Sequence, residues 1–288
     1  MRRSVLLLTL LALVLTATAS SRPLADSKEL AADTPGDSGS APDLTAGSVS
    51  NNNEGRLTWR IGIGNRSQFA APDILFVYMD ADGTESGPDG FEFLLQHDPE
   101  QGPALFKWNG TAWADTESKS LNVSFTSGAL EISIDFRELD SQSLLFWFES
   151  DTLPITADQQ FDQAPNGDGV HFYFVDVPLL FGSFTKPARV TAGRAATLSL
   201  DLWTDGDRRG AVGCTGRVGA KRIRGTGSWA SVTITVPAGG QIVPIAYKGK
   251  ATCKFAIPRS AKRKAISLRI SATKSGVTVF RSLGGRAR

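Results

Sequence analysis

Cysteine, histidine and methionine are scarce in this 288-residue chain, which has two of each. So few thiol and imidazole ligands, with no Cys-x-x-Cys or His-x-x-x-His spacing, argue against a structural zinc site. The longest apolar run, Val5–Val14, is too short for an ordinary membrane span. Hydrophobic residues nevertheless make up 41% of the chain, which is close to the content of folded globular proteins and excludes a disordered tail protein.

The amino terminus predicts export. Met1-Arg2-Arg3 is followed by the apolar run and then by the small residues Ala17-Thr18-Ala19, which is the order of regions in a secretory signal peptide. We expect a signal peptide over residues 1–19 and a secreted mature protein, extracellular or associated with the cell wall. The alternative, a buried first helix, would leave that helix isolated by the polar stretch that follows it.

The two cysteines, Cys214 and Cys253, form an even pair in a chain predicted to enter an oxidising compartment. Such a pair normally closes a disulfide bond. The alternative is two unpaired buried thiols.

Short runs with apolar residues at every second position predict half-buried β-strands. The clearest are Leu57/Trp59/Ile61/Ile63, Leu130/Ile132/Ile134/Phe136, Leu198/Leu200/Leu202, Val232/Ile234/Val236 and Ile266/Leu268/Ile270. No segment keeps an apolar stripe at helical spacing for three turns. The sequence therefore predicts an all-β fold.

The formal net charge of +2 hides an asymmetry along the chain. Residues 21–178 carry 26 acidic and 8 basic side chains, whereas residues 179–288 carry 3 acidic and 21 basic ones. The change predicts two β-sandwich domains in tandem, an acidic one over 48–178 and a basic one over 179–288. Residues 20–47, rich in Asp, Ser, Pro and Gly, are expected to be a flexible leader that is at most partly ordered.

Aspartates recur in two Gly-containing loops. Asp37 and Asp43 precede the first predicted long strand, with Asp33 close by, while Asp80 and Asp82 follow the apolar segment that ends at Met79. Alternating carboxylates in such loops can place several hard oxygens on one Ca²⁺ ion, although neither loop has the glycine and glutamate spacing of an EF-hand. The alternative is solvated turns, in which Asp and Gly are favoured in any case.

Aromatic residues give a second candidate site. Trp108 and Trp113 flank an Asn109-Gly110 turn, and Tyr173 lies in a predicted aromatic strand. Exposed on one face, these three rings would form a platform for carbohydrate. Packing of aromatic residues across neighbouring strands is the more common use of such rings.

Catalytic and redox chemistry have little support. No Gly-x-Ser-x-Gly elbow is present, and no serine is marked as a nucleophile. Haem could use only Met79 with His97 or His171 as axial ligands. An extracellular hydrolase or a haem-binding redox domain is therefore kept as the alternative function.

Basic clusters in the second half indicate either an anionic partner or a surface whose arginines and lysines only keep the domain soluble. They include Arg208-Arg209, Lys221-Arg222-Ile223-Arg224 and Lys262-Arg263-Lys264. For an exported protein, an anionic cell-wall polymer or extracellular glycan is more accessible than nucleic acid, and the dispersed aromatics do not favour stacking of bases. The acidic domain is a further candidate partner, and such an acidic–basic interdomain contact would weaken as salt is added.

The first half resembles exported bacterial β-sandwich domains related to the DOMON and carbohydrate-binding family nine folds. The resemblance rests on Gly36-Asp37 with Pro42-Asp43-Leu44, on Leu57–Ile61, on Met79–Thr84 and on Leu105–Trp113. The resemblance implies a non-catalytic module. Different relatives in that group bind sugar, haem or calcium. Asp37, Asp43, Asp80 and Asp82 stand where acidic loop positions recur in that group.

The second half resembles the immunoglobulin-like domains of exported actinobacterial proteins. The resemblance rests on Val212–Gly219, on Ala251–Pro258 with Phe255 after the second cysteine, and on the closing strands Ile266–Ala272 and Val277–Arg281. It implies a spacer or adhesion module. The sequence as a whole predicts an exported, non-catalytic binding or surface-interaction protein whose first domain takes carbohydrate, calcium or both.

Overall fold

The computed structural model describes residues 26–288 except 31, 84–86, 156–160, 168, 207 and 239–240, and only the backbone of residues 231–245. The described residues form antiparallel sheets linked by turns and three single-turn 3-10 helices, so the predicted all-β fold is confirmed. The predicted signal peptide lies outside the described residues. No helical segment in the described part of the chain is long and apolar enough to cross a membrane.

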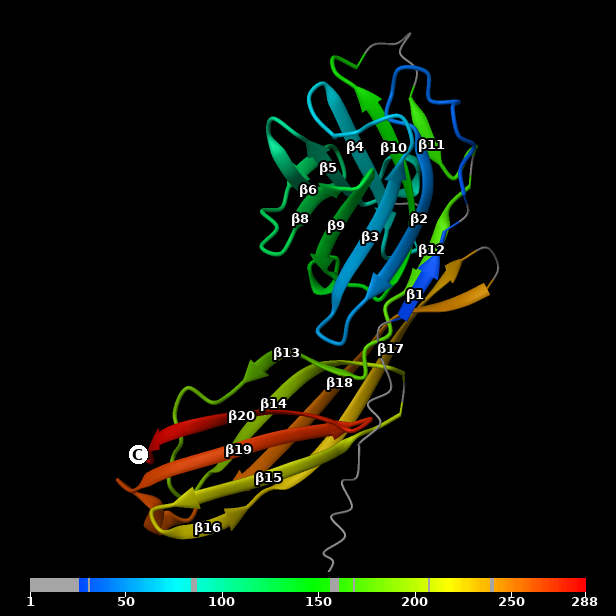
Figure 1. Ribbon diagram of the computed structural model, residues 1–288. Helices are drawn as coiled ribbons and strands as arrows, with labels where there is room; N and C mark the ends of the chain where they lie inside the picture. The colour runs from blue at the N-terminus through cyan, green and yellow to red at the C-terminus, as the bar shows by residue number, and fades with distance from the viewer. Residues whose placement is uncertain are drawn as a thin grey trace, which may run out of the picture.

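Four sheets build two β-sandwich units that lie one beyond the other (Figure 1). The first unit pairs a sheet ordered β1-β2-β3-β9-β8 with a sheet ordered β11-β10-β4-β5-β6-β7, in which β12 also pairs with β10. The second unit pairs β13-β14-β18-β17 with β16-β15-β19-β20.

The strands of the first unit are β1 (Asp26–Glu29), β2 (Leu44–Asn51), β3 (Arg56–Ile63), β4 (Asp73–Asp80), β5 (Phe93–Asp98), β6 (Gly102–Trp108), β7 (Trp113–Asp115), β8 (Asn122–Thr126), β9 (Ala129–Asp135), β10 (Ser143–Thr152), β11 (Asp162–Ala164) and β12 (His171–Phe174). Those of the second are β13 (Leu179–Thr185), β14 (Ala195–Thr204), β15 (Ala211–Val218), β16 (Lys221–Arg224), β17 (Thr226–Ala238), β18 (Gln241–Ala256), β19 (Ala265–Lys274) and β20 (Val277–Arg286). The 3-10 helices are η1 (Pro88–Gly90), η2 (Phe136–Glu138) and η3 (Arg259–Ala261).

Alternation along the strands places the core between the sheets. In β3, Leu57, Trp59 and Ile61 are buried while Arg56 and Arg60 are exposed, as the period-two pattern predicts. The three buried residues of β3 pack with residues of β4, β9 and β10 to form the first core. The second unit has its own core, built largely on β14, β18 and β19.

The described part of the expected leader, residues 26–30 and 32–47, is ordered, which corrects the expectation of flexibility for these residues. β1 and β2 pair with each other, and β2 pairs with β3, so both extend the first sheet. Leu30, Ala41 and Leu44 are buried. Polar groups of the segment are also bonded to the rest of the first unit. Asn65 Nδ2, for example, donates to the carbonyl of Ala41 at 2.8 Å.

The second unit begins at Leu179, the residue at which the charge balance changes. β13 pairs with β14 and not with any strand of the first unit. Its two sheets are joined by the predicted Cys214–Cys253 disulfide, which links β15 to β18 with a Cα–Cα separation of 5.6 Å.

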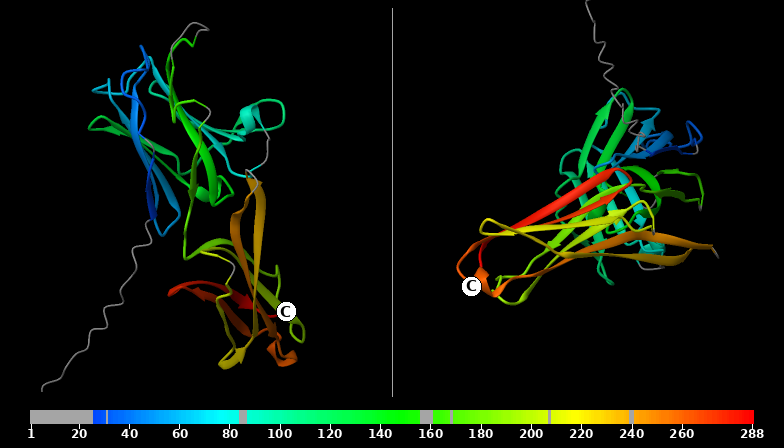
Figure 2. Two further views of the ribbon diagram at one scale, coloured as in Figure 1. Left: turned by 90° about the vertical axis from the view of Figure 1, so that its right-hand side faces the viewer. Right: turned by 90° about the horizontal axis from the view of Figure 1, so that it is seen from below.

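The two units contact each other mostly through uncharged groups. The long strands β17 and β18 extend towards the first unit (Figures 1 and 2). Trp203 lies edge-on to Phe136 at 5.0 Å between ring centroids, and it belongs to the first core. Among the described residues, the only ion pair between the units is Lys248 to Asp140, at 2.9 Å.

Candidate functional site

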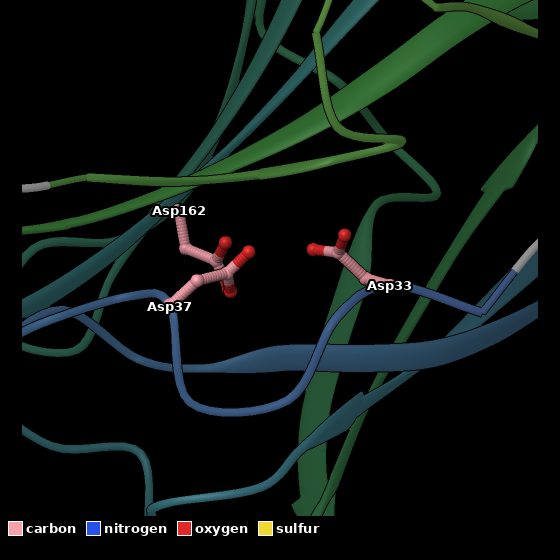
Figure 3. Close-up of side chains that lie close together, drawn as sticks. All are labelled: Asp33, Asp37 and Asp162. Carbon is pink, nitrogen blue, oxygen red and sulfur yellow. The ribbon is translucent and has the colours of Figure 1, made fainter.

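Three carboxylates meet at one end of the first unit. Asp33 and Asp37 lie on the segment between β1 and β2, and Asp162 is the first residue of β11 (Figure 3). One oxygen from each side chain lies within 4.8 Å of the others. We refer to Asp33, Asp37 and Asp162 as the three-aspartate cluster.

Asp33 supplies an oxygen that has no protein partner. Its Oδ1 accepts a hydrogen bond from the backbone N–H of Thr34 at 2.9 Å. Its Oδ2 is fully buried and accepts no hydrogen bond, and the residue as a whole is only 7% exposed. A buried carboxylate oxygen without a donor is costly, so this oxygen is available to a ligand that supplies positive charge.

Asp162 is held rigidly and Asp37 is not. Asp162 is 3% exposed and accepts hydrogen bonds from the backbone N–H groups of Leu44, at 2.5 Å, and Gln163, at 2.9 Å. Asp37 is exposed and accepts one bond from Asn166 Nδ2 at 3.2 Å. The cluster therefore combines two fixed carboxylates with one at its open side.

The electrostatics of the cluster favour a cation. Burial, together with the negative charges of Asp33 and Asp37, raises the pKa of the Asp162 carboxyl to about 6, although the backbone N–H groups of Leu44 and Gln163 act in the opposite direction. Burial likewise raises the pKa of Asp33, with added repulsion from Asp37 and Asp43. No lysine or arginine forms an ion pair with the cluster within the described ranges. A bound cation would remove this repulsion.

A second carboxylate group forms around the β4–β5 connection. Asp80, Asp82 and Glu92 each place one oxygen within 4.8 Å of the others. Asp80 Oδ1 accepts the backbone N–H groups of Asp82, at 3.1 Å, and Gly83, at 2.6 Å. The Asp80 side chain is thus used to shape the turn.

Glu92 is the buried member of this second group. It is 5% exposed, and its Oε1 accepts the backbone N–H of Ala81 at 2.7 Å while its Oε2 is buried without a partner. Burial raises the pKa of Glu92 to about 8, so near neutral pH much of this carboxyl is protonated. A protonated carboxyl is a poor cation ligand, and this second group is therefore the weaker candidate.

The four aspartates predicted as metal ligands are divided between different roles. Asp37 lies in the three-aspartate cluster, while Asp80 and Asp82 lie in the second group. Asp43 lies in neither group of three. Its Oδ1 accepts the backbone N–H of Gly36 at 2.8 Å, so it closes the turn that carries Asp37.

The predicted hairpin at Asn109-Gly110 is present, with a different geometry. Trp108 and Trp113 pair directly across it, so the loop has four residues and only Gly110 has positive φ. The Asn109 side chain accepts the backbone N–H of Thr111 at 3.0 Å. The two tryptophans therefore share a face, with 5.6 Å between ring centroids, although five positions separate them in sequence.

The three predicted carbohydrate-binding rings do not form one platform. Tyr173 is 3% exposed, and its hydroxyl donates to Asn51 Oδ1 at 2.7 Å, so it belongs to the core. Trp113 is half-buried against a small apolar cluster that includes Phe76. Trp108 is half-buried and lines an open cavity.

That cavity has a volume of about 670 Å³ and lies where the two units meet. Its walls combine two aromatic residues, Trp108 and the buried Phe93, with acidic and basic side chains, namely Asp82, Glu92, Asp140, Lys107 and Lys248. An aromatic face surrounded by hydrogen-bonding groups is a common composition for a site that binds small polar molecules.

The residues considered for haem ligation pack against the protein interior. Met79 is fully buried in the first core. The ring of His97 stacks on Phe69, and that of His171 lies against Phe146, each at 5.5 Å between centroids. Burial lowers the pKa of both histidines. These contacts give all three side chains a packing role.

Sequence reasoning missed Asp162 and Glu92 as site residues and named Asp33 only as a neighbour. Asp162 is 125 residues from Asp37 in sequence, and the two meet because their segments lie at the same end of the sandwich. Neither spacing nor composition signals that meeting. Asp33 shares its Asp-rich segment with Asp37, and this proximity is the one local signal that could have included it.

Comparison with known proteins gives no further information about these candidate sites. No protein-family model matches the sequence, and no curated protein matches it either.

Proposed function

We propose that this is an exported, non-catalytic binding protein whose first unit binds Ca²⁺ through the three-aspartate cluster. The proposal rests on one observation above all, the buried Oδ2 of Asp33, which has no donor and belongs to a carboxylate that lies close to those of Asp37 and Asp162. The DOMON-like resemblance and the predicted signal peptide support a binding role outside the cell.

The donor set favours calcium over other common cations. All three ligands are carboxylates, which are hard oxygen donors, and among the residues that the structure describes no cysteine or histidine joins them. Ca²⁺ accepts six to eight oxygens in irregular geometry, so backbone carbonyls and waters can complete its shell, whereas Mg²⁺ requires near-octahedral ligands. Extracellular Ca²⁺ sites commonly have dissociation constants of about 10⁻⁴–10⁻³ M.

A cation in the cluster would join separate parts of the first sandwich. Asp33 and Asp37 precede β2 in the first sheet, while Asp162 begins β11 in the second. Because the ion binds only when these segments are folded together, it should stabilise the folded state by mass action.

Addition of Ca²⁺ to the chelated protein should therefore raise its melting temperature, and Asp37→Asn should abolish the increase. At a hundredfold excess over Kd, linkage predicts about 2.7 kcal/mol, on the order of 10 °C for a unit of this size. Asp37 is chosen because it is exposed and has a single side-chain bond. Thermal unfolding with EDTA and with CaCl₂, together with calorimetric titration, measures the effect.

Asp115→Asn is the matched control, since it removes one exposed carboxylate of the same unit away from both acidic groups. It should leave the calcium response unchanged. Asp37→Asn should also melt at the same temperature as the parent in EDTA, or slightly higher, because it reduces repulsion within the cluster. An equal calcium response in the parent and Asp37→Asn would show that this cluster does not bind the ion.

Carbohydrate binding is a second candidate, favoured by the exposed part of Trp108 in the cavity between the units. A sugar ring could stack on the indole while hydroxyls bond to Asp82, Lys107 and Asp140. The expected contact involves one aromatic ring and not three, because Tyr173 is buried and Trp113 packs on the protein.

Trp108→Ala should then weaken binding of a responsive glycan by at least about tenfold, since stacking of this kind contributes about 1–3 kcal/mol. A glycan array followed by titration of the best responder measures this loss. Trp147→Ala removes a half-buried indole elsewhere on the same sheet and serves as the control. An array without responders, or equal losses in the two variants, would contradict the carbohydrate proposal.

A further inference from the structure

The outer face of the β16-β15-β19-β20 sheet carries a group of arginines. Arg222 of β16 lies directly opposite Arg217 of β15, and Arg224 lies opposite Thr215. On its other side, Thr215 lies opposite Arg269 of β19. The register therefore gathers Arg217, Arg222, Arg224 and Arg269 on neighbouring positions, and we call these four residues the arginine face.

The strand alternation makes this face point outward. Residues next to these positions in the chain, Val218 on β15 and Leu268 and Ile270 on β19, point to the opposite side and are buried in the second core. All four arginines are exposed. The fold thus fixes their backbone positions while leaving the guanidinium groups accessible.

No carboxylate of the described residues pairs with the arginine face. None of its four residues forms an ion pair in the described part of the chain. The unit's described acids are used elsewhere, since Asp201 lies 3.7 Å from Lys250 and Asp205 lies 2.8 Å from Lys274. Like charges opposite each other across strands are destabilising, so an anionic ligand would remove a cost that the folded protein otherwise carries.

The same face contains a groove and a positioning contact. A cavity of about 420 Å³ is lined by Arg217, Arg222, Arg269, Thr215, Ser267 and Ser282. The guanidinium carbon of Arg269 lies 3.9 Å from the centroid of the Phe280 ring, which restricts that side chain. The groove thus offers planar cationic donors interspersed with hydroxyl donors.

We propose that this groove binds the phosphodiester groups of a linear anionic polymer of the cell envelope. Guanidinium groups donate paired hydrogen bonds that match phosphate oxygens, and the three hydroxyls can donate to oxygens that remain. Several cationic donors along one open groove fit a repeating charge better than a single small anion. The site lies on the second unit, so it is independent of the calcium proposal.

The test measures binding of fluorescent poly(glycerol phosphate) to the full chain by anisotropy at several salt concentrations. Arg217→Ser with Arg269→Ser should raise Kd at least about tenfold and lower the slope of log K against log salt by about two. Lys186→Ser with Lys254→Ser is the matched control. It removes the same charge from exposed positions on the other sheet of this unit or beside it.

Both double variants should unfold at or near the parent temperature, because every substituted side chain is exposed. Equal loss of binding in the two variants would reduce the interaction to net charge and overturn the proposed site. Tighter binding of polygalacturonate or duplex DNA would overturn the phosphodiester assignment. Salt-sensitive self-association that Arg217→Ser with Arg269→Ser abolishes, without polymer binding, would assign the face to a second copy of this chain and overturn the proposal.

Discussion

Replacement of both Cys214 and Cys253 by alanine should lower the free energy of unfolding of the second unit by about 4 kcal/mol, from the entropy of the chain loop that the disulfide closes. The two residues are 39 positions apart in sequence, and the bond joins β15 to β18 across the sandwich. For a unit of about 100 residues this loss corresponds to roughly 15–20 °C in melting temperature.

The bond is the only covalent link between the two sheets of this unit other than the chain itself, since the sequence has no further cysteine. Urea unfolding of the parent and the double variant measures the difference. Reductant should lower the stability of the parent and leave that of the variant unchanged. A difference below about 1 kcal/mol would show that the disulfide contributes little to the folded unit.

Gln142→Ala should have the second large effect, a loss of roughly 3–5 kcal/mol together with separation of the two units. Gln142 is fully buried. Its Nε2 donates to the carbonyls of Val175, at 3.0 Å, and Thr204, at 3.2 Å, while its Oε1 accepts the backbone N–H of Tyr247 at 2.7 Å. Alanine would leave these three backbone groups buried without partners.

Because Thr204 and Tyr247 belong to the second unit, the side chain of Gln142 connects the units directly. The variant should show a larger radius of gyration in small-angle scattering and two unfolding transitions in place of one. Gln101→Ala, at an exposed turn of the first unit, should change stability by less than about 0.5 kcal/mol. A single unchanged transition in Gln142→Ala would rule out this docking role.

The same contacts revise the expected effect of salt on the two units. Their opposite net charges predict an attraction that salt would screen. Among the described residues, however, the interface contains the buried hydrogen bonds of the Gln142 side chain, the Trp203–Phe136 contact and one ion pair. The side chain of Asp140 in that ion pair is 74% exposed, so the pair contributes little to the free energy that holds the two units together. We therefore expect the units to stay docked at 500 mM salt.

The strands were predictable where burial alternates within a few residues. β3 and β19 follow the period-two pattern because one face of each lies on a core and the other is more exposed. β9 and β14 keep their apolar face on a core, but Ser133 of β9 and Ser199 of β14 on the other face are buried as well. Residues 20–47 were expected to be a flexible leader that is at most partly ordered, whereas the described residues 26–30 and 32–47 are ordered. The order of this part depends on the pairing of β1 with β2 and on hydrogen bonds between polar groups, which cannot be predicted from local hydrophobicity.

The candidate sites were only partly predictable. The sequence pointed to Asp37, Asp80 and Asp82 because acidic residues are concentrated near them, and it pointed to Trp108 because of the adjacent turn. It did not separate Asp43, which closes a turn, from Asp37, which joins the cluster. It also placed Tyr173 on a surface, whereas the bond from its hydroxyl to Asn51 lets the ring be buried.

The sequence by itself determined the all-β class, the change of charge at residue 179 and the identity of the two cysteines that pair. These properties depend on the local periodicity of apolar residues, on the charge composition of each half, and on the presence of only two cysteines. Only the tertiary structure decided that Asp162 joins Asp33 and Asp37, and that four arginines from three strands share one face. Those groupings depend on strand pairing and sheet order, which bring together residues that no fixed spacing along the chain relates.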